Sequence, residues 1–172
     1  MAGKLIFVVG GARSGKSGFA LKLAGDLPGP KAYMATARAL DLEMEERISA
    51  HKKDRGPGWE TIEEPEDVAE RIIALNGYGA IVLDCLTLWL MNLIEAGVDD
   101  VKVKERAVRL AEACKGSDAC VIAVSNELGL GIVPENPLAR RFRDLAGVVN
   151  QLVARAADEF YFVAAGIPLR LK

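Results

Sequence analysis

The sequence predicts a three-layer α/β fold in which helices cover both faces of a mostly parallel sheet. Short β-branched runs alternate with longer segments of helical periodicity, which is the pattern of βαβ units. The strand candidates are almost entirely apolar, as strands buried on both faces should be. A chain of 172 residues is the size of one compact domain, so we expect a single domain over residues 1–172.

The expected strands are the apolar runs at Leu5–Val9, Ala32–Ala35, Ala80–Leu83, Cys120–Val124 and Phe160–Val163, with a further edge strand at Pro168–Leu171. The expected helices have apolar residues at helical spacing and lie at Lys16–Leu27, Asp41–Lys53, Pro65–Leu75, Leu86–Glu95, Val101–Ala113 and Pro137–Ala157. The polar stretches Lys53–Gly58 and Gly129–Pro137 contain glycine and proline and are expected to be loops. In such a fold, loops beyond the carboxyl ends of the strands form the ligand crevice.

The composition indicates a cytoplasmic globular protein. Residues are 51% hydrophobic and 27% charged, and 22 basic against 24 acidic residues leave a net charge of −2, so no surface for nucleic acid or anionic lipid is expected. No apolar run is long enough for a membrane span or a signal peptide. The three cysteines lack zinc-like spacing, and we expect buried free thiols at Cys85, Cys114 and Cys120.

A glycine-rich motif follows the first expected strand and opens the first expected helix. It matches the P-loop pattern and consists of Gly10, Gly11, Ala12, Arg13, Ser14, Gly15, Lys16 and Ser17. Glycines let backbone N–H groups face phosphates, the helix N-terminus adds a positive dipole, and Lys16 supplies a cation. Ser17 is expected to bind Mg²⁺, and ATP or GTP is the expected substrate. A plain glycine turn is the structural alternative.

Asp84 is the expected carboxylate partner of this motif. A P-loop needs an acid at the end of a neighbouring strand to hold the Mg²⁺ shell, and Asp84 ends the apolar run Ile81–Leu83. An aspartate at a strand-to-helix junction is also a common helix N-cap. Both roles are compatible with the sequence.

The chain has a single histidine, His51. It continues an apolar stripe of helical spacing formed by Leu40, Met44 and Ile48. Basic residues gather where that helix should end, at Lys52, Lys53 and Arg55. By spacing alone, such a histidine is more commonly a packed core residue than a catalyst, and basic side chains at a helix C-terminus need no ligand to explain them.

Further segments match, in order and spacing, the pattern of one known family. They are Tyr33–Ala37, the run from Asp41 through Arg47 and His51 to Arg55, Trp59, Glu63–Pro65, Leu83–Thr87, Ser125–Glu135 and Arg141–Gln151. With the P-loop, the chain resembles the bifunctional adenosylcobinamide kinase / adenosylcobinamide-phosphate guanylyltransferase family over nearly its whole length. The P-loop is shared with many unrelated enzymes, whereas the segments around His51 and from Asn126 to Gln151 are specific to this family.

The resemblance implies a kinase step on the corrinoid adenosylcobinamide and then transfer of GMP from GTP to the new phosphate. It implies that His51 attacks the α-phosphate and carries GMP as a phosphoramidate, which is nucleophilic catalysis by imidazole. It also implies a homotrimer, and a GTP site lined by Thr36, Lys52, Lys53, Asp54, Arg55, Glu63 and Asp84. ATP and GTP remain alternatives for the kinase step, and no base for it is evident.

Two other functions are compatible with a P-loop alone. A simple nucleotide or small-metabolite kinase would leave His51 inert. A nucleotide-gated switch would use hydrolysis to change loop order and partner affinity, but the sequence has no exposed apolar or basic stripe that indicates a partner surface. Only guanylyl transfer predicts protein labelling from the α-phosphate of GTP.

Overall fold

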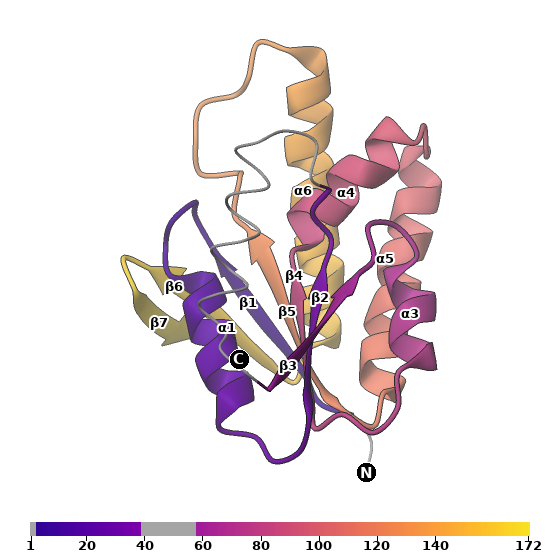
Figure 1. Ribbon diagram of the computed structural model, residues 1–172. Helices are drawn as coiled ribbons and strands as arrows, with labels where there is room; N and C mark the ends of the chain where they lie inside the picture. Colours follow the sequence, from indigo (N-terminus) through magenta and orange to yellow (C-terminus); the bar gives the residue numbers. More distant parts are fainter. Residues whose placement is uncertain (1–2, 39–57) are drawn as a thin grey trace.

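The computed structural model describes residues 3–38 and 58–172. Its centre is a seven-stranded sheet in the order β3-β2-β4-β5-β1-β6-β7 (Figure 1). The strands are β1 (Leu5–Gly10), β2 (Lys31–Ala35), β3 (Trp59–Glu63), β4 (Ala80–Asp84), β5 (Cys120–Asn126), β6 (Glu159–Ala164) and β7 (Ile167–Arg170). All neighbours are parallel except β6 and β7. The predicted mostly parallel α/β fold is confirmed.

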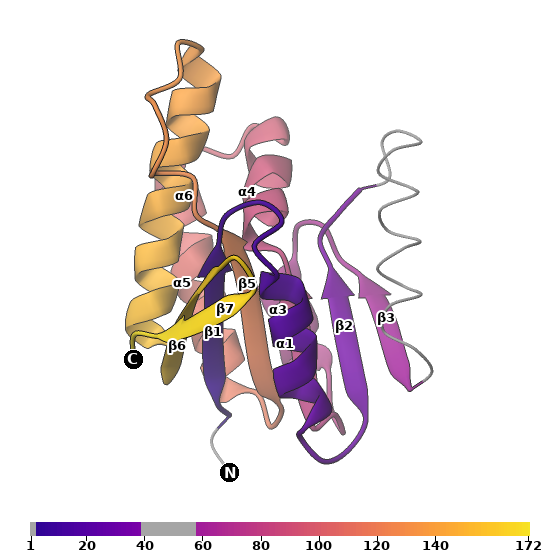
Figure 2. The same cartoon turned by 90° about the vertical axis from the view of Figure 1, so that its left-hand side faces the viewer.

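Helices cover both faces of the sheet. They are α1 (Lys16–Gly25), α3 (Val68–Ala74), α4 (Leu86–Glu95), α5 (Asp100–Gly116) and α6 (Pro137–Ala156). Figures 1 and 2 show α1 on one face and α3, α4, α5 and α6 on the other. Strand β1 illustrates this arrangement. Phe7 belongs to the core under the four helices, and the next residue, Val8, belongs to the core under α1. Alternate residues of one buried strand thus serve two cores.

The structure corrects three parts of the sequence prediction. Strand β3 was not expected, because only Ile62 in Trp59–Glu63 is buried and glutamates flank it. Helix α3 begins at Val68 rather than Pro65, since the Glu64 carboxylate accepts hydrogen bonds from the N–H groups of Glu66 and Asp67 at 3.0 and 2.9 Å. These bonds form a turn ahead of the helix. Helix α5 extends to Gly116, beyond the expected end at Ala113.

The expected helix Asp41–Lys53 lies outside the described residues, as does most of the expected loop Lys53–Gly58. The second expected loop is observed up to Asn136, and Pro137 is the first residue of α6. Within residues 3–38 and 58–172, no helix has the length and apolar character needed to cross a membrane.

The three cysteines are unpaired. Cys85 and Cys114 are buried, whereas Cys120 is only half-buried, which corrects the expectation that all three are enclosed. Burial raises the pKa of the Cys85 thiol to about 11 and that of Cys114 to about 12. These two thiols are packing residues of the core rather than nucleophiles.

Candidate nucleotide-binding site

The glycine-rich motif forms a loop between the end of β1 and the start of α1. Gly15, the N-cap of α1, has a φ of 91°, and Arg13 has a φ of 57°. These left-handed conformations turn the chain sharply at the amino end of the helix. The backbone N–H groups of the loop and the positive end of the α1 dipole therefore lie together at the N-terminus of α1, where they can stabilise an anion.

The side chain of Lys16 is folded into this loop. Its ammonium group donates a hydrogen bond to the carbonyl of Gly11 at 3.0 Å, and the residue is only 9% exposed. Burial lowers the pKa of Lys16, while the nearby charge of Asp84 opposes that shift. The hydroxyl of Ser14 is buried without a hydrogen-bond partner among the described residues. The loop thus holds a desolvated cation and an unsatisfied hydroxyl, both suited to phosphate.

Neighbouring strands fix the loop from two sides. Glu127, after β5, donates its N–H to the carbonyl of Gly10 at 3.1 Å, and Gly166, in the turn between β6 and β7, donates to the carbonyl of Ser14 at 2.8 Å. A β-carbon at Gly10 would lie 2.5 Å from both the Ser14 hydroxyl and the Val163 carbonyl. Glycine is therefore required at position 10 by close packing.

Asp84 lies at the end of β4 on the same edge of the sheet. Its strand is not next to β1, contrary to the expectation of a neighbouring strand, because β5 lies between them. Its charge nevertheless acts on Lys16. Because β4, β5 and β1 are parallel, Asp84 and the loop after β1 lie at the same edge of the sheet, separated by the end of β5.

Asp84 does not cap α4. Cys85 occupies the N-cap position of that helix and no side chain caps it. Instead, Oδ2 of Asp84 accepts a hydrogen bond from the hydroxyl of Tyr33 at 2.9 Å. Among the described residues, Oδ1 of Asp84 has no hydrogen-bond partner, and this leaves one carboxylate oxygen for a ligand.

Thr36 and Glu63 follow the same edge of the sheet. Ala35 is in register with both Glu63 on β3 and Asp84 on β4, so these strand ends are aligned. Thr36 is fully buried, and its hydroxyl donates to the carbonyl of Cys85 at 2.7 Å and accepts from its N–H at 2.9 Å. The Thr36 side chain therefore fixes the backbone of Cys85. The family resemblance implies a nucleotide-site role for Thr36 but none for Tyr33, and no local pattern in the sequence indicates that the Tyr33 hydroxyl reaches Asp84.

Two residues at this edge of the sheet have side chains suited to Mg²⁺. Ser17 at the start of α1 and Asp84 offer a hydroxyl and a carboxylate oxygen, the hard donors that Mg²⁺ prefers. Within the described part of the chain, no group of three or more histidine, cysteine, aspartate or glutamate side chains is arranged to hold a metal. This fits an ion that takes most of its ligands from phosphate and water.

The remaining predicted site residues lie outside the described residues. They are His51, Lys52, Lys53, Asp54 and Arg55. The described part of the chain stops shortly after β2, which lies next to Asp84's strand β4, and resumes just before β3, which lies on the other side of β2. The structure brings the glycine-rich loop Gly10–Ser17, called the cradle from here on, to the same edge of the sheet as Thr36, Glu63 and Asp84.

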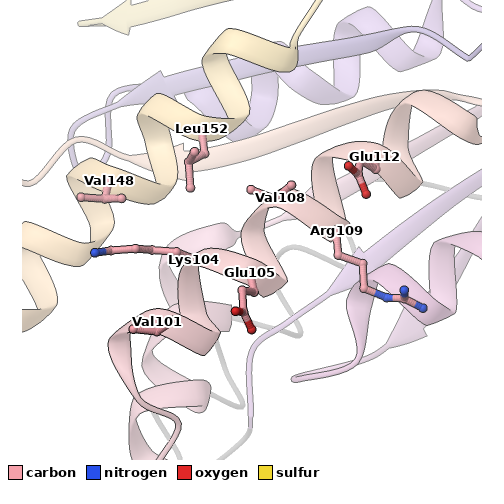
Figure 3. Close-up of a pocket in the computed structure, with 8 residues that line it drawn as sticks. All are labelled: Val101, Lys104, Glu105, Val108, Arg109, Glu112, Val148 and Leu152. Carbon is pink, nitrogen blue, oxygen red and sulfur yellow. The ribbon is translucent and has the colours of Figure 1, made fainter.

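A separate hollow of about 490 Å³ lies between α5 and α6 (Figure 3). Its aliphatic side chains are Val101, Val108, Val148 and Leu152, and charged side chains of α5 surround them. It contains no glycine-rich backbone. The features suited to phosphate, a buried cation and an unsatisfied hydroxyl, lie in the cradle and not in this groove.

Comparison with known proteins identifies the family of this chain. The profile of the family described as "Cobinamide kinase / cobinamide phosphate guanyltransferase" matches residues 6–171. The chain is 45% identical to a "Bifunctional adenosylcobalamin biosynthesis protein CobU" from Salmonella typhimurium, covering 98% of this chain and 99% of that protein. It is 41% identical to a protein of the same name from Escherichia coli, with the same coverage.

Among solved structures, the ATPase EscN of the enteropathogenic E. coli type III secretion system shares the fold. The TM-score is 0.61 at 12% identity, and the match covers 95% of this chain and 43% of that one. At this identity the likeness concerns architecture alone. The family match extends over nearly the whole chain and includes the cradle at the end of β1. This chain therefore belongs to the cobinamide kinase / cobinamide phosphate guanyltransferase family of enzymes.

Proposed function

We propose that this protein phosphorylates adenosylcobinamide with ATP or GTP and then transfers GMP from GTP to the phosphate, giving adenosylcobinamide-GDP in cobalamin biosynthesis. The observation that carries the proposal is the phosphate cradle of Gly10–Ser17, with a buried Lys16, in a chain of this family. The proposed acceptor is a corrinoid, and neither nucleic acid nor membrane is a proposed partner. We further propose a cytoplasmic homotrimer, by resemblance to the family.

The kinase step uses the cradle. The hydroxyl oxygen of the acceptor forms a bond to the γ-phosphorus, the bond from that phosphorus to the β,γ-bridging oxygen breaks, and the hydroxyl proton is released. Backbone N–H groups of Gly11–Gly15 and the ammonium of Lys16 stabilise the charge that moves onto the phosphate oxygens. Ser17 and Asp84 would hold Mg²⁺, which screens the negative charge of the triphosphate when bound.

The guanylyl step uses His51, by resemblance. An imidazole nitrogen forms a bond to the α-phosphorus of GTP, and the bond from that phosphorus to pyrophosphate breaks. A phosphate oxygen of adenosylcobinamide phosphate then bonds to the same phosphorus as the phosphorus–nitrogen bond breaks, which restores the imidazole. For the first bond to form, His51 must be neutral with one ring nitrogen free.

The other nucleotide contacts are proposed from the same resemblance. Glu63 and the segment Lys52–Arg55 would line the GTP site, and the basic side chains would offset phosphate charge during the attack by His51. The Thr36 hydroxyl is occupied by Cys85, so Thr36 would contribute through its backbone and its position.

The test is labelling with GTP that carries the label at the α-phosphate. We expect the wild-type protein to acquire a label that acid removes and alkali spares, as for a phosphorus–nitrogen bond and unlike a serine ester. His51→Ala should lose this label and GMP transfer but keep phosphorylation of adenosylcobinamide, since the kinase step needs only the cradle, the metal and the acceptor.

The same experiment separates the alternatives. A simple nucleotide or metabolite kinase, or a nucleotide-gated switch, predicts no covalent label on the wild-type protein. Label that persists on a folded His51→Ala protein, or equal loss of both activities, would contradict the assignment of His51 as a dedicated GMP carrier.

A further inference from the structure

We infer that Tyr33 and Thr36 are positioning residues that together hold Asp84 in the orientation needed for the metal–nucleotide complex. The inference rests on the proposed role of Asp84 as a residue that holds Mg²⁺. Both positioning residues come from β2 or its end, and Asp84 comes from the adjacent strand β4.

Tyr33 acts on the carboxylate. It is in register with Val82, two residues before Asp84, and its side chain extends along the sheet so that the hydroxyl donates to Oδ2 of Asp84 at 2.9 Å. Tyr33 is only 5% exposed and belongs to the apolar core under α1. A hydrogen bond to a carboxylate in such a poorly solvated place is strong and directional, so it fixes how the carboxylate is turned.

Thr36 acts on the backbone that follows Asp84. Its hydroxyl makes two hydrogen bonds to Cys85, one to the carbonyl and one from the N–H, at 2.7 and 2.9 Å. Its own N–H donates to the carbonyl of Asp84 at 3.2 Å. Asn92 of α4 in turn donates to the carbonyl of Thr36 at 2.8 Å. The single hydroxyl proton of Thr36 is already used, so the side chain supports Asp84 rather than donating to a ligand.

Asp84 is thus restrained at its carboxylate by Tyr33 and at its backbone by Thr36. The restraint leaves Oδ1 without a partner among the described residues, on an edge where the Asp84 charge also acts on Lys16. Groups that orient a metal-holding carboxylate typically change metal affinity by about ten- to a hundredfold when removed. Loss of the Tyr33 hydroxyl should therefore weaken metal binding without altering the cradle that binds phosphate.

The experiment measures Mn²⁺ affinity by electron paramagnetic resonance on the full chain with a non-hydrolysable GTP analogue. Affinity for the analogue is measured separately by calorimetry, with Mn²⁺ and with excess chelator. We expect Tyr33→Phe to weaken Mn²⁺ binding by about tenfold and to leave metal-free analogue binding unchanged. In a double-mutant cycle, Tyr33→Phe should cause no further loss of Mn²⁺ affinity once Asp84→Asn is present. The reason is that the Tyr33 hydroxyl acts on the metal only through the Asp84 carboxylate.

Matched variants exclude a general loss of structure. Tyr78→Phe removes a hydroxyl from another tyrosine–carboxylate pair, with Glu60 on the edge strand β3, and should leave Mn²⁺ affinity unchanged. Thr36→Val removes both contacts to Cys85 and should weaken Mn²⁺ binding, whereas Thr36→Ser should retain it. Because Thr36→Val also leaves buried peptide groups unpaired, Tyr33→Phe carries the test if the valine protein does not fold.

Two results would overturn the inference. If Asp84→Asn loses Mn²⁺ affinity but Tyr33→Phe keeps it, Tyr33 only packs, and the proposed metal role of Asp84 survives. If Asp84→Asn keeps full Mn²⁺ affinity, the metal role and the inference fall together. The labelling of His51 is measured independently of both outcomes, so the guanylyl transfer proposal is judged separately.

Discussion

The ammonium group of Lys16 lies in the cradle under two opposing influences. Burial lowers its pKa, and the negative charge of Asp84 acts in the opposite direction. Its hydrogen bond to the carbonyl of Gly11 replaces only part of the hydration that burial removes. A triphosphate in the cradle would add negative charge beside Lys16 and favour its protonated form. The charge of Lys16 is therefore better compensated with nucleotide than without it.

At the residue scale, Lys16→Ala should reduce phosphoryl transfer to adenosylcobinamide by far more than tenfold. The mutation removes the cation that we propose faces the terminal phosphates but leaves a residue that suits a helix. The measurement is the initial rate with ATP or GTP as donor. Lys22→Ala, which removes an exposed lysine from the same helix, is the matched control. A Lys16→Ala rate above about a tenth of wild type, a barrier change below about 1.4 kcal/mol, would contradict the role of the cradle.

At the element scale, the start of α6 depends on Asn136. The Asn136 side chain accepts a hydrogen bond from the N–H of Ala139 at 3.1 Å, and Pro137 is the first helical residue. This is an N-cap followed by proline at N1, where proline lacks only an N–H that the helix would leave unpaired. The cap ends the loop that starts beside the cradle at Glu127. Helix α6 thus begins at a defined point on the edge that carries the proposed site.

Asn136→Ala should lower the free energy of unfolding by about 1 kcal/mol, because the N–H of Ala139 loses its partner. Urea unfolding followed by circular dichroism measures the change. Asn136→Asp keeps a side-chain acceptor at the N-terminus of the helix and should retain wild-type stability. An equal loss in both variants would show that Asn136 stabilises the loop by another contact and not as a cap.

At the scale of the whole molecule, Asp158 joins three elements. Its carboxylate accepts hydrogen bonds from the N–H of Leu5 in β1 at 2.8 Å and from Lys115 in α5 at 2.5 Å, and its own N–H donates to the carbonyl of Leu5. Asp158 immediately precedes β6. These contacts hold the pKa of Asp158 below its usual range, with the Lys115 contact the larger cause. Protonation of Asp158 should therefore weaken its contacts to the sheet at Leu5 and to helix α5 at Lys115.

The sign of this coupling follows from linkage. A carboxyl group whose pKa is lower in the folded state stabilises the protein above its unfolded pKa, near 3.9, and this stabilisation is lost as pH falls through the folded value. Asp158→Asn should therefore be less stable than wild type at pH 7 by about 1 kcal/mol, a small value because the side chains of Asp158 and Lys115 are both partly solvated. The difference should shrink as pH is lowered below about 4.

Chemical unfolding at a series of pH values measures this difference. Asp118→Asn removes an exposed carboxylate at the turn before β5 that makes neither contact, and it should track wild type at every pH. A deficit of Asp158→Asn that stays constant down to pH 2 would mean that the asparagine disrupts packing and that the charge of Asp158 does not matter.

Local patterns in the sequence predicted most of the strands and the position of the cradle. The apolar runs located six of the seven strands, including the edge strand β7, and the glycine motif located the cradle between β1 and α1. These signals succeed because they are local: the buried strands β1, β2, β4 and β5 need an unbroken apolar run, and a phosphate cradle needs its residues at fixed spacing. Burial does not explain β7, whose apolar residues are exposed. The family resemblance, carried by motifs over nearly the whole chain, was confirmed by the match over residues 6–171.

The order of the strands in the sheet and the contacts of the residues at their ends emerged from the folded structure. It placed β5 between the cradle strand and Asp84, added β3 at the edge, and showed that Tyr33 reaches the Asp84 carboxylate while Thr36 holds Cys85. None of these follows from spacing, because parallel strands joined by crossovers pair across long separations in the chain. The partner of a buried hydroxyl is set by that pairing, and no local pattern in the sequence encodes it.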